Sequence, residues 1–230
     1  VLSCKQRANE KLVVQTQADP ILLEVFNNLF MSIAEQMGVR LQQTARSVNI
    51  KERLDFSCAV FDSNGDLIAN APHTPVHLGS MDRSVASVLQ AHPRMHKGDV
   101  FVTNAPYNGG THLPDITVIT PVFHKDEAQP VFFVASRGHH ADVGGTAPGS
   151  MTPLATHIED EGVILENLKL VSNGKFLHLE IFETLTQNKY PCRNPDQNIA
   201  DLKAQIAANE KGVLELTSMI SQFGYDTVHI

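Results

Sequence analysis

Apolar residues recur at helical spacing in two long segments, one near each end of the chain. The first opens with Asp19 and Pro20, a typical helix start, and its apolar positions continue to about residue 45. The second runs from Pro195 to about Gln222. Because the first segment is apolar around much of its girth, we expect neighbouring elements to bury it. Its side chains expected to lose most of their exposed area are Leu22, Val25, Leu29 and Ile33.

Runs of β-branched and aromatic residues between these helices predict short paired strands. FSCAVF meets Asn64-Gly65 and continues as DLIAN, which is a strong hairpin signal. Residues 71–82 contain two prolines and a glycine and predict an irregular loop, followed by a helix from about Ser80 to Gln90. Further segments predict strands (DVFVTNAP, GVILENLKLV), a long loop (residues 146–162) and a short helix (HLEIFETLTQN). The order lacks regular βαβ alternation, so we expect an α+β fold of mainly antiparallel strands and hairpins flanked by two long helices.

Composition and charge exclude several classes of function. The 230-residue chain has a net charge of −7 and no basic cluster, which argues against a nucleic-acid partner. No apolar run approaches the length of a transmembrane helix, so we expect no membrane partner. The three cysteines, Cys4, Cys58 and Cys192, are widely spaced and fit reduced thiols in a cytoplasmic protein. Residues 1–18 do not form a signal peptide and are expected to be a linker or a leading strand.

Metal-ligand side chains gather around two apolar runs between His112 and Gly145. His112 and Asp115 flank the start of ITVITPVF, and Arg137, His139, His140 and Asp142 follow the end of VFFVAS. If these runs pair as an antiparallel hairpin, the start of the first lies beside the end of the second. Two histidines and a carboxylate suit a divalent metal such as Zn, Mn or Fe, with positions left for water or substrate. Because neighbouring residues of a strand point to opposite faces, at most one of His139 and His140 can easily share a site with His112.

The alternative is that these histidines are ordinary surface or core residues. A single histidine beside a strand more often has such a role, so the metal hypothesis depends on the convergence. Glycine pairs at residues 109–110 and 144–145 border the stretch, where they could take positive φ or let the backbone approach a ligand. The sequence contains no GxxxxGK[ST], strand-linked GxGxxG or GxSxG pattern, so nucleotide binding and serine hydrolysis are not indicated.

Four long motifs together resemble the hydantoinase B/oxoprolinase family: DPILLEVFNNLFMSIAEQMG, RLDFSCAVFDSNGDLIANAPHTPVHLGSM, GDVFVTNAPYNGGTHLPDITVITPVF and RGHHADVGG. The family includes the B-type components of ATP-dependent N-methylhydantoinases and the C-terminal half of 5-oxoprolinases. The likeness covers residues 19–230, which resemble the N-terminal part of a larger domain. Some apolar surface of the first helix would then face the rest of that domain instead of this chain's own core.

The resemblance implies a metal-bearing part of an ATP-dependent cyclic amide hydrolase. In related carboxylases an HxxD pair and a later histidine hold a metal, and these map onto His112, Asp115 and His139. A hydantoinase A-like partner domain or subunit would bind ATP and phosphorylate the carbonyl oxygen of a small lactam or imide ring. Water activated by the metal, with a pKa near ~7, would then open the activated ring.

Five further residues are candidates for supporting roles in this chemistry. Asp142 could orient a ligand histidine, and Arg137 could hold a substrate carboxylate or phosphate through its planar fork. Asp55, Ser57 and His77 could line the pocket. Each has a structural alternative: Asp55 as a cap, Ser57 as strand packing, and Arg137 as an ion-pair partner of Asp142.

Two other functions remain open at this point. The chain could belong to a carboxylase alpha-type subunit that uses the same metal to manage an enolate and carboxyphosphate. It could also be a non-catalytic scaffold that docks a hydantoinase A-like ATPase. In each case we expect an oligomer.

Overall fold

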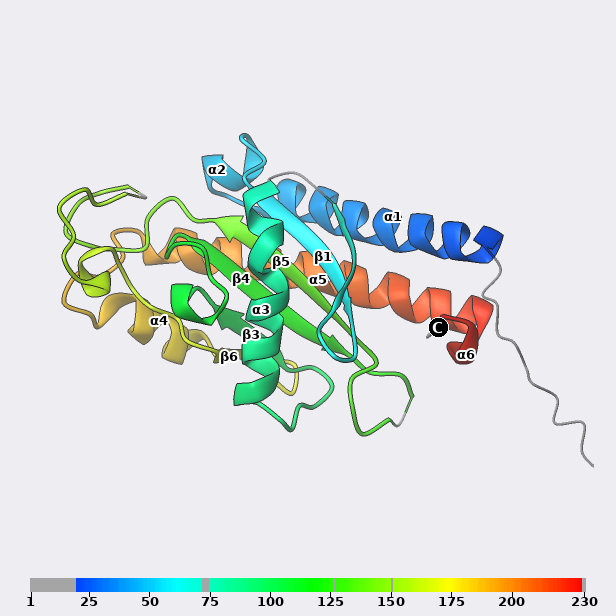
Figure 1. Ribbon diagram of the computed structural model, residues 1–230. Helices are drawn as coiled ribbons and strands as arrows, with labels where there is room; N and C mark the ends of the chain where they lie inside the picture. The colour runs from blue at the N-terminus through cyan, green and yellow to red at the C-terminus, as the bar shows by residue number, and fades with distance from the viewer. Residues whose placement is uncertain (1–19, 72–74, 126, 150, 229–230) are drawn as a thin grey trace, which may run out of the picture.

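A seven-stranded antiparallel sheet lies at the centre of the molecule (Figure 1). The computed structural model describes residues 20–71, 75–125, 127–149 and 151–228. The strand order is β2-β1-β5-β4-β3-β6-β7. In chain order the strands are β1 (Phe56–Asp62), β2 (Leu67–Ala71), β3 (Val100–Thr103), β4 (Asp115–Val122), β5 (Phe132–His139), β6 (Leu168–Ser172) and β7 (Lys175–Phe176).

Helices cover both faces of this sheet. The long helices α1 (Pro20–Thr44) and α5 (Pro195–Phe223) lie side by side on one face, and α3 (Pro75–Ala91) crosses the other (Figure 1). The shorter helices are α2 (Val48–Lys51), α4 (His178–Thr186) and α6 (Tyr225–Val228), with 3-10 turns at Pro106–Asn108 and Ile158–Asp160. The α+β fold with two long helices is therefore confirmed. Across the described ranges, no helix combines the length and the apolar character needed to cross a membrane.

The central strands are buried on both sides. On one face Val60 and Val134 pack with Met37 of α1 and Ala208 of α5. On the other face the strands pack against α3 in a second cluster, which includes Phe61, Val85, Val88, Phe101 and Phe133. All eight residues of β4 and the first seven of β5 are buried, so apolar runs replace the alternation of a half-exposed sheet.

The N-terminal half of α1 is more exposed than its sequence predicts. Ile33 is buried and Leu29 partly so, but Leu22 and Val25 are 46% and 43% exposed, so the expectation for these two residues is wrong. The buried stripe is narrow and consists of Phe26, Phe30, Ile33, Ala34, Met37, Gly38 and Leu41. Val25 lies to the side of this stripe, and Leu22 lies in the first turn, where α1 reaches past the sheet (Figure 1).

Two other sequence expectations need correction. The irregular loop expected over 71–82 is helical from Pro75 onward, because a proline is well suited to the first helical position; residues 72–74 lie outside the described ranges. The strand expected from residue 162 begins only at Leu168, although the Leu165 carbonyl still accepts from the Asn104 N–H. The expected Asn64-Gly65 hairpin, the β4–β5 hairpin and both long helices are confirmed. The linker or strand expected over residues 1–18 also lies outside the described ranges.

Candidate metal centre

The hairpin of β4 and β5 brings the three expected metal ligands together. In its register Asp115, the first residue of β4, stands opposite His139, the last residue of β5. His112 lies three residues before Asp115, in the turn that leads into β4. The convergence expected from the sequence is therefore confirmed: one potential ligand atom from each residue lies within 4.8 Å of the other two.

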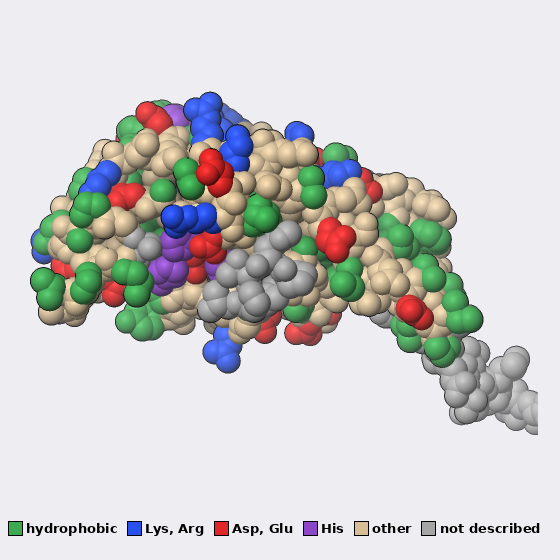
Figure 2. Space-filling model, turned by 90° about the horizontal axis from the view of Figure 1, so that it is seen from above, with side chains coloured by type: hydrophobic (Ala, Val, Ile, Leu, Met, Phe, Trp, Pro, Cys, Tyr) green, Lys and Arg blue, Asp and Glu red, His purple; other side chains and the backbone are tan. Residues whose placement is uncertain are grey.

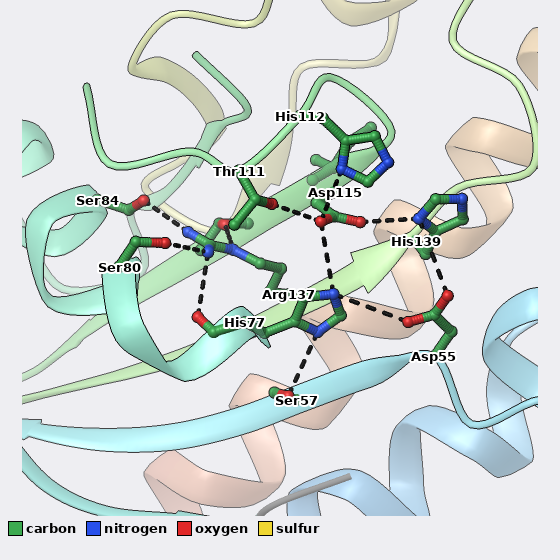
Figure 3. A network of polar contacts seen from close by, with 12 residues as sticks. Asp55, Ser57, His77, Ser80, Ser84, Thr111, His112, Asp115, Arg137 and His139 are labelled. Atoms are coloured by element: carbon green, nitrogen blue, oxygen red, sulfur yellow. Dashed lines mark hydrogen bonds and ion pairs between the residues drawn. The ribbon is translucent and has the colours of Figure 1, made fainter. Parts of the chain in front are cut away.

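Both carboxylate oxygens of Asp115 face imidazole nitrogens (Figure 3). The distance from Oδ2 to His112 Nδ1 is 2.9 Å, and the distance from Oδ1 to His139 Nδ1 is 2.8 Å. Asp115 is buried, and no lysine or arginine among the described residues forms an ion pair with it. A divalent cation at this point would supply a counter-charge for the carboxylate. Nitrogen and oxygen donors in this arrangement suit Zn, Mn or Fe, so the residues fit a divalent metal.

A third histidine and a second carboxylate surround these ligands. His77 Nε2 lies 3.5 Å from Asp115 Oδ2 and 3.7 Å from Asp55 Oδ1. Asp55 Oδ2 in turn lies 3.9 Å from His139 Nδ1, and Ser57 Oγ lies 3.3 Å from His77 Nδ1. The structure thus places the expected residues Asp55, Ser57 and His77 around the three candidate ligands (Figure 3). Ser57 is fully buried, whereas the Asp55 side chain is 34% exposed, so Asp55 is the member that solvent reaches.

Arg137 is a buried brace behind the site. All five of its N–H donors are used: one on Thr117 Oγ1, two on the His77 carbonyl and Ser80 Oγ, and two on Ser84 Oγ and the Gly109 carbonyl. Because the side chain is fully buried and fully bonded, the expectation that its fork is open to a substrate group is wrong. Its contacts instead join β4, β5, α3 and the 109 turn.

Asp142 makes its contacts away from the ligand histidines. Its Oδ2 accepts from Arg193 at 2.7 Å, and its Oδ1 accepts from the backbone N–H groups of Gly144 and Arg193. The expected contact with a ligand histidine and the alternative pairing with Arg137 are both wrong. Asp142 instead ties the 142–145 turn to the segment before α5.

The polar contacts shift the pKa of several groups. Burial alone would raise the pKa of Asp115, but hydrogen bonds from His112, His139, His77 and Thr111 hold it well below its usual range. The hydrogen bond to Asp115 raises the pKa of His112. Burial lowers the pKa of Arg137 to about 10, so Arg137 stays positively charged at neutral pH. The site therefore holds a carboxylate that is ionised at neutral pH.

A polar pocket opens beside His112. It has a volume of about 350 Å³ and is lined by Pro106, Tyr107, Thr111, His112, Ala155, Thr156, His157, Ile158 and Glu161. His112 is one-third exposed, whereas His139 is more enclosed, so His112 is the ligand on the open side. Figure 2 shows histidine side chains reaching the surface beside acidic ones. A small molecule in this pocket would lie next to the candidate metal ligands.

Glycines shape the backbone around the site. Gly109 has a φ of +91°, and a Cβ there would lie 2.3 Å from the Ser84 nitrogen; Gly144 has a φ of +90°, and a Cβ would lie 2.2 Å from the Tyr190 carbonyl oxygen. Positive φ is confirmed for both positions. The close neighbours are backbone atoms of this chain, so these glycines let its turns pack closely.

His140 and its partners form a second polar group, on the opposite face of the sheet from His139. Its Nε2 lies 3.0 Å from Gln205 Oε1, and its Nδ1 lies 3.1 Å from Asn198 Nδ2. The expectation that only one of the two neighbouring histidines joins the site is confirmed. Gln205 and Asn198 were not predicted from the sequence. The signal for them is the set of uncharged polar residues Asn198, Gln205 and Asn209 on the apolar face of α5.

Comparison with known proteins identifies the family. A model described as "Hydantoinase B/oxoprolinase" matches residues 19–230. The chain belongs to the hydantoinase B/oxoprolinase family. It is 50% identical over 217 residues to a "5-oxoprolinase" of Dictyostelium discoideum, covering 94% of this chain and 17% of that protein. It is 31% identical over 216 residues to the B component of a putative D-/L-hydantoinase from a Pseudomonas strain, covering 91% of this chain and 36% of that protein.

Two solved structures of larger enzymes share the fold. An ATP-dependent caprolactamase from Pseudomonas jessenii superposes with a TM-score of 0.81 at 30% identity, over 92% of this chain and 36% of that one. A nucleotide-free acetone carboxylase superposes with a TM-score of 0.83 at 19% identity, over 92% of this chain and 28% of that one. The chain thus spans well under half the length of each relative described here.

Proposed function

We propose that this family member is the metal-bearing part of an ATP-dependent cyclic amide hydrolase of the 5-oxoprolinase or N-methylhydantoinase type. The observation that carries the proposal is the cluster of His112, Asp115 and His139 at the joined ends of β4 and β5. Relatives named 5-oxoprolinase, D-/L-hydantoinase and ATP-dependent caprolactamase support the substrate class of small cyclic amides. Residues 19–230 then form the N-terminal part of a larger hydantoinase B-type domain.

His112, Asp115 and His139 are the residues that would hold the metal. A divalent ion bound there would supply Lewis acidity and make water a competent nucleophile near neutral pH. The pocket beside His112 would place the ring carbonyl next to the ligands. Asp55, which is partly exposed and 3.7 Å from His77, is placed to accept a proton from water, while Arg137 holds the His77 backbone in position.

A partner domain or subunit would bind ATP. No nucleotide-binding motif occurs in the sequence, and a lactam carbonyl must be activated before water attacks it readily. A hydantoinase A-like ATPase that phosphorylates the ring oxygen would supply this activation. We place the assembly in the cytoplasm. In this chain Cys58 and Cys192 are free, buried thiols, which fit a reducing compartment.

The test is ring opening by the full-length protein with its ATPase partner. His112→Ala and Asp115→Ala should each lower turnover of 5-oxoproline or a hydantoin by at least ~10²-fold, as for loss of an acid–base or electrostatic group. The matched control is His178→Ala, which removes an exposed histidine of α4 outside the cluster and should leave turnover unchanged. Folding of each variant is checked by thermal melting.

Other outcomes would favour the alternative functions. A loss under tenfold in folded His112→Ala would favour a scaffold that docks the ATPase, with the histidines only joining two strand ends. Bicarbonate-dependent turnover of a ketone, without ring opening, would favour a carboxylase alpha-type subunit. The acetone carboxylase likeness supports only the shared fold, so it does not favour that outcome by itself.

A further inference from the structure

Buried side chains on the α5 face of the sheet form hydrogen bonds near the strand ends that carry the candidate ligands. Gln205 is fully buried in α5, and its Nε2 donates to the Ile116 carbonyl at 2.8 Å and to the Ser136 carbonyl at 3.0 Å. Ile116 directly follows Asp115, and Ser136 lies three residues before His139. One amide group therefore spans β4 and β5 near their ligand-bearing ends.

The same amide also reaches the residue after His139. Gln205 Oε1 accepts from His140 Nε2 at 3.0 Å, and Asn198 Nδ2 donates to His140 Nδ1 at 3.1 Å and to the Asp142 carbonyl at 2.9 Å. Only one arrangement satisfies every contact: a neutral imidazole protonated on Nε2, with the Gln205 amide nitrogen facing the strand carbonyls and the Asn198 amide nitrogen facing His140 Nδ1 and the Asp142 carbonyl. Both amide N–H groups of Gln205 and of Asn198 are thus used.

We infer that Gln205, assisted by His140 and Asn198, is a positioning residue that fixes the spacing of Asp115 and His139 for the metal. The inference rests on the proposed function, since it assumes that a metal binds this cluster. The Asp115–His139 pair is the last of the β4–β5 register, and beyond it one backbone hydrogen bond, from the His140 N–H to the Pro114 carbonyl at 2.8 Å, joins the two segments. A second restraint near this pair would limit further how far the strand ends can separate. Gln205 supplies that restraint through the backbone, from the face that substrate does not reach.

The chain provides a matched control one turn further along α5. Asn209 is also fully buried, and its Nδ2 donates to the Val118 carbonyl at 2.9 Å and to Thr120 Oγ1 at 3.1 Å. A longer contact, 3.5 Å to the Val134 carbonyl, reaches β5, so Asn209 contacts the same two strands farther from Asp115 and His139. Loss of either amide removes buried hydrogen bonds, so a purely structural role predicts similar consequences for both.

The experiment compares Gln205→Met with Asn209→Leu in the full-length protein. Each substitution keeps the approximate volume and removes the amide. We measure the Kd for Mn²⁺ and Zn²⁺, the absorption spectrum of bound Co²⁺, and the melting temperature without metal. Gln205→Met should raise the Kd by at least ~10-fold, the range for loss of a residue that orients ligands, and alter the Co²⁺ spectrum. Asn209→Leu should lower the melting temperature without either change.

The outcomes separate this inference from the proposed function. If wild-type protein binds metal but both variants change the Kd equally, or Gln205→Met leaves it unchanged, Gln205 has only a structural role and the inference is overturned. If wild-type protein binds no metal, or His112→Ala binds it as well as wild type, the proposed metal centre itself fails. If Gln205→Met does not fold, Asn198→Ala takes its place: a several-fold higher Kd supports the inference, and an unchanged one overturns it.

Discussion

Asp115 is the residue at which the contacts of the candidate site meet. Its two oxygens face His112 and His139, its Oδ2 also accepts from Thr111, and His77 approaches at 3.5 Å. These groups hold the pKa of the carboxyl well below its usual range, so Asp115 carries a buried negative charge at neutral pH. A buried anion with an imidazole nitrogen beside each of its two oxygens favours binding of a cation.

The brace formed by Arg137 is open to direct test. Arg137→Lys should lower the free energy of unfolding by at least about 2 kcal/mol, since a lysine cannot reach all the acceptors and leaves buried carbonyls such as that of Gly109 unbonded. Urea denaturation gives the value, with Arg193→Lys as the control at a half-exposed ion pair. A change of less than about 0.5 kcal/mol for Arg137→Lys would contradict the brace, because that much is typical of ordinary surface substitutions.

Residue types predicted where ligands lie better than they predicted which polar residues are buried. The hairpin pattern and the strand alternation predicted that His112 and Asp115 would meet one of His139 and His140, and the family resemblance selected His139; the structure confirms this set. The partners of Arg137 could not be predicted, because they come from three other segments that meet β5 only in the folded chain. The same holds for Asp142 and Arg193, which are 51 residues apart.

At the scale of elements, the burial of α1 depends on position along the helix as well as on composition. Leu41→Ala, at a fully buried position, should cost about 2–5 kcal/mol of unfolding free energy. Leu22→Ala, at a position 46% exposed, should cost less than about 0.5 kcal/mol. Thermal melting of the two variants checks the difference; equal losses would mean that the first turns of α1 are buried in solution.

The pair of Asp99 and Lys169 predicts a pH-dependent effect at the β3–β6–β7 edge. Asp99 is fully buried; its carboxylate accepts from Lys169 at 2.9 Å and from the backbone N–H groups of Asn173 and His96. Asp99→Asn should cost about 1–3 kcal/mol at pH 7. Burial alone would raise the pKa of Asp99, but these hydrogen bonds lower it below the usual value.

The sign of the pH effect follows from that lowered pKa. A carboxyl with a depressed folded-state pKa stabilises the protein fully above its unfolded-state pKa of about 3.9. The stabilisation is lost as the pH falls through the folded-state value. The difference between wild type and Asp99→Asn in urea should therefore be constant from about pH 7 to about 5 and shrink below about pH 4. A difference that grows on acidification would show that the carboxylate destabilises the fold.

Elements with strong local signals were predicted well, and those set by tertiary contacts were not. Asn64-Gly65 and the proline starts at Pro20 and Pro195 fixed a hairpin and two helices correctly. Pro75 was assigned to a loop because Pro72 and Gly79 lie close to it in the sequence, yet the helix that it begins packs across the sheet. The extended segment before Leu168 forms no strand pair. Whether it pairs depends on where the neighbouring strand β3 ends.

At the scale of the whole molecule, metal binding should contribute to stability, because the ligands come from two strands and a turn. At a metal concentration of 100 times Kd, the gain is about 2.7 kcal/mol. For a domain of this size, each 1 kcal/mol shifts the melting temperature by about 2–4 °C. Dialysis against EDTA should thus lower the melting temperature by several degrees, and Mn²⁺ or Zn²⁺ should restore it. His112→Ala should have the same melting temperature with EDTA and with added metal. If metal raised the melting temperature of the variant as much as that of the wild type, the metal would bind elsewhere.

The double-sided burial of β5 also decides how the chain finds its strand alignment. Both faces of the sheet are apolar here, with Phe133 and Ala135 on one side and Val134 on the other. Hydrophobic packing alone would therefore tolerate a shift of one residue in the pairing of β4 and β5. After a shift that brings His140 opposite Asp115, an imidazole would still lie there. Such a shift would put a neighbouring residue in the place of Arg137, and that residue could not donate to the five acceptors that Arg137 bonds. It would also displace the strand carbonyls to which Gln205 donates. The polar residues on the two faces thus specify one strand alignment, which hydrophobic packing alone would leave open.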